Sequence, residues 1–132
     1  MKLSEDEVVL IENAKEYLTA FLANYGEFHP FAMIMDKNKN IYPLEHDIEE
    51  DYPKAESLIN LYEQYFKNEL NGENILGILC TNVLIGSKSA NEPKRDAIEI
   101  RLIGENYRKK VFQYYELKEQ QVLYQELIGM AT

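Results

Sequence analysis

The sequence is poor in cysteine and in long hydrophobic runs. Its single cysteine, Cys80, excludes a disulfide within these 132 residues, and a lone cysteine is usual in the reducing cytoplasm. The longest apolar run, residues 75–85, is too short for a membrane-spanning helix, which needs roughly 18–20 apolar residues. The acidic residues that follow Lys2 do not fit a signal peptide. We therefore expect a soluble, cytoplasmic protein.

Positive charge is also scarce, and the deficit is uneven. The net charge is −9. Residues 1–75 contain 6 Lys and Arg against 16 Asp and Glu, whereas residues 76–132 contain 8 against 7. An acidic chain repels nucleic-acid phosphates, so no nucleic-acid partner is expected. A basic protein partner is compatible with this charge, although acidity serves solubility alone in many proteins.

Catalytic, metal-binding and phosphate-binding motifs are missing as well. Zinc sites usually have paired ligands at short spacing, and His29, His46 and Cys80 lack that spacing. Residues 36–40 resemble the start of a calcium loop, but Ile41 stands where that loop needs glycine. Residues 86–89 resemble part of a phosphate loop without its first glycine. We expect no metal, no cofactor and no catalytic residues, and we lean against an enzyme.

The periodicities predict one α+β domain over residues 1–132. Ser4 and Glu7 form a capping box before a helix at 4–25, which Gly26 ends, and a second helix is predicted at 53–70. Strands are predicted at 31–35, 41–45, 75–85, 96–104 and 109–117. Residues 122–128 fit a strand or a short helix, and alternation of Val122, Tyr124 and Ile128 favours the strand. Hairpins dominate this order, so we expect two helices on one face of a mainly antiparallel five- or six-stranded sheet, in the order α-β-β-α-β-β-β-(β).

Two short segments carry a resemblance. Residues 26–32, Gly-Glu-Phe-His-Pro-Phe-Ala, resemble a segment of a group of small uncharacterised bacterial proteins, in which it follows an N-terminal helix. Residues 96–98, Asp-Ala-Ile, are similar to a strand of the same group. The resemblance implies a shared fold and points to no known activity. The order of elements also resembles the roadblock and profilin-like arrangement, which is an analogy of fold only.

The leading hypothesis is a non-enzymatic protein-binding domain, of which an immunity or regulatory protein is one form. Its acidic binding residues would be Glu45, Asp47, Glu49, Glu50 and Asp51, and its aromatic anchors would be Tyr107, Tyr114 and Tyr124. The alternative is a small-molecule-binding or enzymatic domain with a pocket between helices and sheet, for which His29 is the best polar candidate. A homodimer is compatible with either hypothesis.

Overall fold

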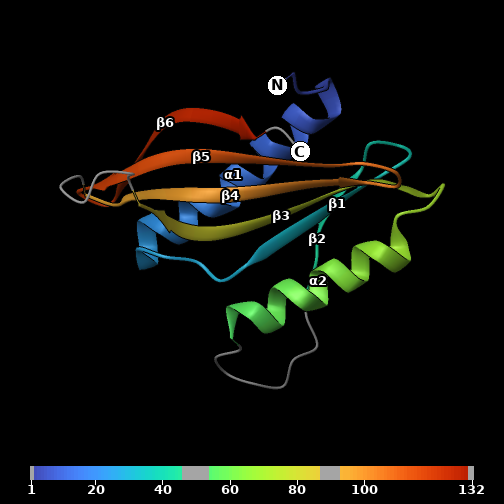
Figure 1. The fold of residues 1–132 in the computed structure, drawn as a ribbon, viewed down its shortest axis with the longest axis horizontal. Helices are drawn as coiled ribbons and strands as arrows, with labels where there is room; N and C mark the ends of the chain where they lie inside the picture. The colour runs from blue at the N-terminus through green and yellow to red at the C-terminus, as the bar shows by residue number, and fades with distance from the viewer. Residues whose placement is uncertain (1, 46–53, 87–92, 131–132) are drawn as a thin grey trace.

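The residues that the structure describes form two helices and one six-stranded sheet (Figure 1). The computed structural model describes residues 2–45, 54–86 and 93–130. The elements are α1 (Glu5–Tyr25), β1 (Phe31–Asp36), β2 (Ile41–Pro43), α2 (Ala55–Glu69), β3 (Asn74–Ile85), β4 (Arg95–Gly104), β5 (Arg108–Lys118) and β6 (Gln121–Met130). The strands lie in the order β2-β1-β3-β4-β5-β6, and every neighbouring pair is antiparallel. The predicted α+β fold and element order are confirmed, with a strand at residues 122–128.

Both ends of α1 have the predicted caps. The Glu7 amide donates to Ser4 Oγ at 3.1 Å, and the Ser4 amide donates to Glu7 Oε1 at 2.7 Å, so the capping box is complete. Gly26 ends the helix with φ of +74°, a conformation that glycine adopts without strain. The cap turns the chain away from α1 and toward β1.

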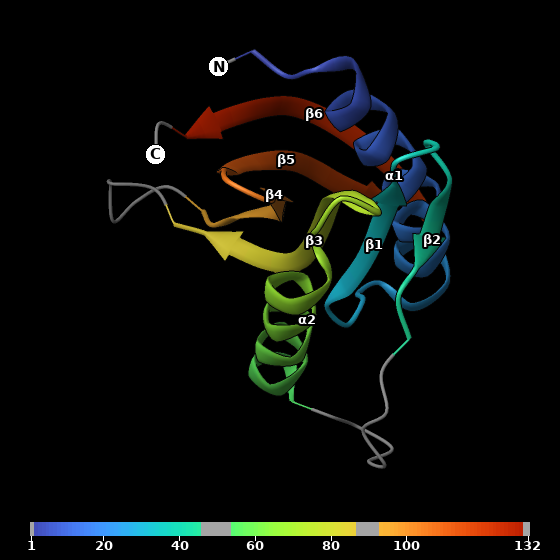
Figure 2. The same cartoon turned by 90° about the vertical axis from the view of Figure 1, so that its right-hand side faces the viewer.

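The two helices pack on opposite faces of the sheet, so the prediction of a shared face is wrong. Residues of β1 alternate between two hydrophobic cores. Met33 and Met35 pack with α1, whereas Ala32 and Ile34 pack with α2. The continuous apolar runs at 31–35 and 75–85 explain this arrangement, because a strand that is buried on both faces is apolar along its whole length. Figure 2 shows the sheet lying between α1 and α2.

The Phe66 ring of helix α2 packs directly against β3. The Phe66 ring is 1% exposed and lies directly over Gly77 of β3, which has no side chain to exclude it. On the same face, the Glu63 carboxylate accepts hydrogen bonds from Arg108 at 2.6 and 2.7 Å and from Arg101 at 3.2 Å. The close approach of α2 to the sheet therefore depends on a glycine.

Strand β6 contains an irregularity that the sequence pattern hides. The pairing with β5 shifts register between Gln113 and Tyr115. Val122 and Tyr124 pack against the α1 core, but Ile128 pairs with Phe112, which lies on the other face of the sheet from its neighbour Val111. The predicted alternation of Ile128 with Val122 and Tyr124 is therefore wrong, because the shift reverses the faces along the strand.

The buried side chain of Gln113 bonds to the backbone at this irregularity. Its Nε2 donates to the carbonyl oxygens of Tyr114 and Gln125, both at 3.0 Å, and its Oε1 accepts from Lys15 Nζ at 3.2 Å. Gln113 thus satisfies carbonyl groups that a regular ladder would pair with amides.

Replacing Gln113 with leucine is expected to lower the free energy of unfolding by about 1–3 kcal/mol, the cost of leaving buried carbonyl groups without donors. Urea unfolding measures this difference. The matched control is Gln121→Leu, at an exposed position of the same sheet, which is expected to change stability by less than about 0.5 kcal/mol. Equal effects of the two substitutions would contradict this role for Gln113.

Candidate functional site

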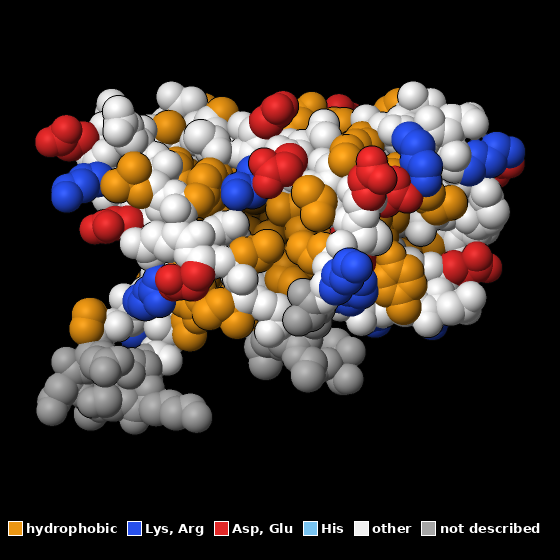
Figure 3. Space-filling view, turned by 90° about the horizontal axis from the view of Figure 1, so that it is seen from above, with side chains coloured by type: hydrophobic (Ala, Val, Ile, Leu, Met, Phe, Trp, Pro, Cys, Tyr) orange, Lys and Arg blue, Asp and Glu red, His pale blue; other side chains and the backbone are white. Residues whose placement is uncertain are grey.

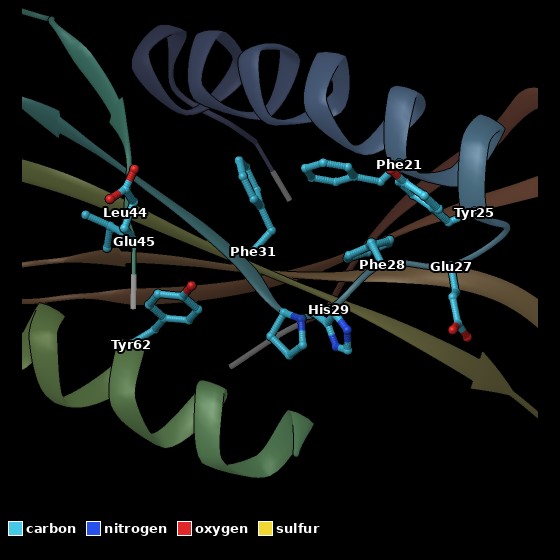
Figure 4. Close-up of a pocket in the computed structure, with 10 residues that line it drawn as sticks. Phe21, Tyr25, Glu27, Phe28, His29, Phe31, Leu44, Glu45 and Tyr62 are labelled. Atoms are coloured by element: carbon cyan, nitrogen blue, oxygen red, sulfur yellow. The ribbon is translucent and has the colours of Figure 1, made fainter. Parts of the chain in front are cut away.

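A pocket of about 790 Å³ lies beside the β2 edge of the sheet, between the C-terminal end of α1 and the middle of α2 (Figure 4). Ligand-binding pockets commonly fall in a range of about 300–1,000 Å³. The side chains that line it are mostly aromatic: Phe21, Tyr25, Glu27, Phe28, His29, Pro30, Phe31, Leu44, Glu45 and Tyr62. Size and lining make it the candidate binding site.

The local sequence explains how these side chains converge. Gly26 ends α1, and Pro30 disfavours helix at His29, so residues 27–30 run extended from α1 into β1. Leu44, after β2, stays beside β1 because its amide donates to the Ala32 carbonyl oxygen at 2.9 Å. Tyr62 reaches the pocket from α2 on the other side. Helices on opposite faces of the sheet thus both contribute walls where the sheet ends.

The aromatic wall on the α1 side is packed ring against ring. The Phe31 ring lies 5.7 Å from the Phe21 ring in an edge-to-face arrangement and 5.1 Å from the Tyr17 ring. Such pairs are favourable and hold each ring in one orientation. A ligand would therefore meet a wall formed before it binds, at little cost in side-chain entropy.

Tyr62 is the buried polar group of the pocket. Tyr62 is 4% exposed as a whole residue, and it lines the pocket. Burial raises the pKa of this hydroxyl, so it stays protonated at neutral pH. In Figure 4 the Tyr62 ring extends from α2 toward the side of the pocket occupied by Phe31. A tyrosine hydroxyl can both donate and accept a hydrogen bond, so Tyr62 offers a ligand in the pocket a polar contact.

The charge of the lining is negative. Glu27 and Glu45 are exposed and lie at opposite sides of the pocket, as Figure 4 shows. The lining includes no lysine or arginine among the described residues. Aromatic faces are also electron-rich, so both wall and rim favour a positively charged ligand over an anion.

Comparison with known proteins found no relative of this chain. No family model, curated protein or solved structure matches it. The function is therefore inferred from the residues of the pocket and their chemistry.

The structure brings together two of the residues that the sequence singled out, since His29 and Glu45 both line the pocket. His29 was predicted as the polar candidate for a pocket, and Glu45 was predicted as part of an acidic binding surface. The other acidic candidates, Asp47, Glu49, Glu50 and Asp51, lie outside the described residues. They follow Glu45 directly in the sequence and so belong to the same acidic stretch.

The three candidate tyrosines lie apart from the pocket and from one another. Tyr107 packs over Gly104 in the turn between β4 and β5. Tyr114 lies on β5 with the Arg95 guanidinium 4.1 Å from its ring centroid. Tyr124 packs under α1, where its hydroxyl and that of Thr19 are 2.7 Å apart. They do not form one continuous surface.

Cys80 is a core residue. It is fully buried in the α1-side cluster, and burial raises the pKa of its thiol well above the ordinary value. Within residues 2–45, 54–86 and 93–130, no group of three His, Cys, Asp or Glu side chains has the arrangement of a metal site. In the same ranges no helix is both long and apolar enough to cross a membrane.

Sequence reasoning missed most of the pocket wall. Phe21 and Tyr62 recur at helical spacing with other apolar residues, which predicts a buried face, and both contact a core as well as the pocket. The available signal was the density of aromatic residues around Pro30. Phe28, His29 and Phe31 occur within four positions of a segment that the proline holds extended.

Exposed hydrophobic side chains also occur away from the pocket, on α1 and on β6, and those of β6 fall on both faces of the sheet. Viewed from above, hydrophobic side chains gather near the middle of the molecule between charged groups (Figure 3). The exposed large hydrophobic residues of these two elements include Val8, Val9, Leu123, Leu127 and Ile128. Strand β6 is also an edge of the sheet. A homodimer stays a prediction, and this edge is the surface that we expect it to use.

Proposed function

We propose that this protein is a non-enzymatic binding protein that holds a positively charged protein partner at the β2 edge. The observation that carries the proposal is the pocket, whose lining combines aromatic rings with Glu27 and Glu45 and has no lysine or arginine among the described residues. The acidic residues 45–51 continue from its rim in the sequence. An immunity or regulatory role, in which the partner is a basic toxin or effector, is one form of this function.

The uneven charge of the chain supports the proposal. The excess of acidic residues falls in residues 1–75, which supply every residue of the pocket lining. Complementary charge speeds association and selects partners, and its contribution weakens as salt screens it. Partner binding is therefore expected to be sensitive to salt.

Reversing Glu49, Glu50 and Asp51 to lysine is expected to weaken partner binding by about tenfold or more, because these charges steer and hold a basic surface. The measurement is a pull-down from native lysate at low and high salt, followed by titration of the captured protein. The control reverses Glu105, Glu116 and Glu119, which are exposed residues in β5 and its flanking turns. It changes the net charge equally, so equal weakening by both variants would contradict a localised binding surface.

The same pocket supports a second candidate, the binding of a small molecule between helices and sheet. Its volume is that of a ligand site, and His29 lines it. A metabolite that raises the melting temperature of the wild type and not of His29→Ala would favour this candidate. No shift across a broad panel would count against it.

A further inference from the structure

We propose that the pocket receives a single alkylammonium group, the side chain of a lysine of the partner, with its charged nitrogen between the aromatic rings and the Tyr62 hydroxyl. This inference rests on the proposed function, which names a positively charged partner, and it adds the chemical group that the site recognises. The partner's lysine would enter past Glu27 and Glu45 at the rim.

Each part of an alkylammonium group has a counterpart in the lining. The apolar stem fits the rings of Phe21, Phe28 and Phe31, of which two are already packed edge to face. The ammonium nitrogen is attracted to aromatic faces. Its three N–H groups need acceptors, and the hydroxyl oxygen of Tyr62, which lines the pocket, can accept one of these hydrogen bonds.

Other ligand classes fit less well. An anion would meet the Glu27 and Glu45 carboxylates and no lysine or arginine among the described lining residues. A neutral apolar group would use the rings but would gain nothing from these carboxylates or from the Tyr62 hydroxyl. The small, strongly hydrated ammonium also matches one isolated acceptor, whereas the planar guanidinium of arginine prefers a bidentate carboxylate.

The test uses three probes with the same four-carbon stem: n-butylammonium, n-butanol and pentanoate. Their affinities for the intact protein are measured by two-dimensional NMR titration at constant ionic strength. We expect n-butylammonium to bind about tenfold or more tightly than either analogue, the ratio that corresponds to one good charge-assisted hydrogen bond. The shifted amide signals are expected to come from residues 21–31, 44–45 and 62.

Tyr62→Phe removes the acceptor and keeps the ring. This variant is expected to bind n-butylammonium about tenfold more weakly. Glu45→Gln is expected to weaken binding, whereas Glu116→Gln, with the same charge change at an exposed position of β5, is not. n-Propylguanidinium binding as tightly as n-butylammonium would overturn the choice of ammonium.

Equal binding of n-butanol and n-butylammonium, or unchanged binding by Tyr62→Phe, would overturn the inference. The proposed function fails by a different result. If charge reversal of residues 49–51 still releases the partner while n-butylammonium does not bind the pocket, the partner uses the acidic surface and this inference alone is wrong. If n-butylammonium binds as described and no partner depends on the acidic residues, the proposed function is wrong, but the pocket is still a binding site for an alkylammonium group.

Discussion

Replacing Gly77 with alanine is expected to lower the free energy of unfolding by about 1–3 kcal/mol, the usual cost of overpacking a core. A methyl group on Gly77 would lie 2.6 Å from Phe66 Cδ1 and overlap the ring. Phe66 is fully buried under α2, so its ring has no open space to enter. The added methyl group would push α2 away from the sheet. Urea unfolding measures the loss.

Gly72→Ala is the control, because nothing lies within 4 Å of a methyl group at that position. This control is expected to change stability by less than about 0.5 kcal/mol. Phe66→Leu replaces the ring with a smaller side chain and so makes room for the methyl group. The loss of stability in the double variant, Gly77→Ala with Phe66→Leu, is therefore expected to be smaller than the sum of the losses in the two single variants. Additive effects would show that Phe66 and Gly77 are not in contact as described. Because Tyr62 lies on the same helix, a displaced α2 would also open the pocket.

Replacing Lys109 with methionine is expected to destabilise the protein by about 3 kcal/mol at neutral pH, the lower end of the cost of breaking a buried ion pair. The Glu7 carboxylate is 0% exposed and accepts a hydrogen bond from Lys109 Nζ at 2.7 Å. Without Lys109 the buried charge keeps only its bond from the Ser4 amide. The matched control is Lys110→Met. The Lys110 side chain is 43% exposed, and its Nζ lies 3.8 Å from Glu99 Oε1. That loss is expected to be under about 1 kcal/mol.

The effect of Lys109→Met is expected to depend on pH. Burial by itself would raise the pKa of the Glu7 carboxyl, but hydrogen bonds from Lys109 and Ser4 hold it below 4.5. A lowered pKa means that the carboxylate contributes stability above the unfolded value, and that this contribution is lost as the pH falls through the folded pKa. Without Lys109 the effect of burial dominates, and Glu7 gains a proton more readily.

The difference in stability between wild type and Lys109→Met is therefore expected to be largest near neutral pH and to shrink as the pH falls through the folded pKa of Glu7, first in the variant and then, below 4.5, in the wild type. Thermal unfolding across this range measures it. A difference that does not change with pH would show that lost packing of the lysine stem, and not the buried charge, accounts for the effect.

Much of the fold was predictable because its local signals agree. The Ser4 and Glu7 capping box and the Gly26 cap are short-range features that the backbone requires at helix ends. The placement of α2 was not predictable in this way. The apolar runs of β1 and β3 were recognised as strands, but their lack of alternation was not used as a sign that both faces are covered.

The pocket was predictable only in part, because it forms from segments that are distant in the sequence. His29 was recognisable as a polar group in an aromatic segment, and Glu45 as the start of an acidic stretch. That Tyr62 would face them depends on α2 crossing to the far face of the sheet, which depends in turn on Gly77. A periodic stripe identifies the buried side of a helix and does not identify which cavity its edge reaches.

The central claim is that the partner binds through the pocket, and a competition experiment tests it most directly. The captured partner is washed with n-butylammonium chloride or with sodium chloride at equal ionic strength, so that screening is the same in both. We predict that n-butylammonium releases the partner from the wild type at a concentration at which sodium chloride does not, and that Tyr62→Phe lessens this advantage. Equal release by the two salts would contradict the claim, because the partner would then be held by surface charge alone.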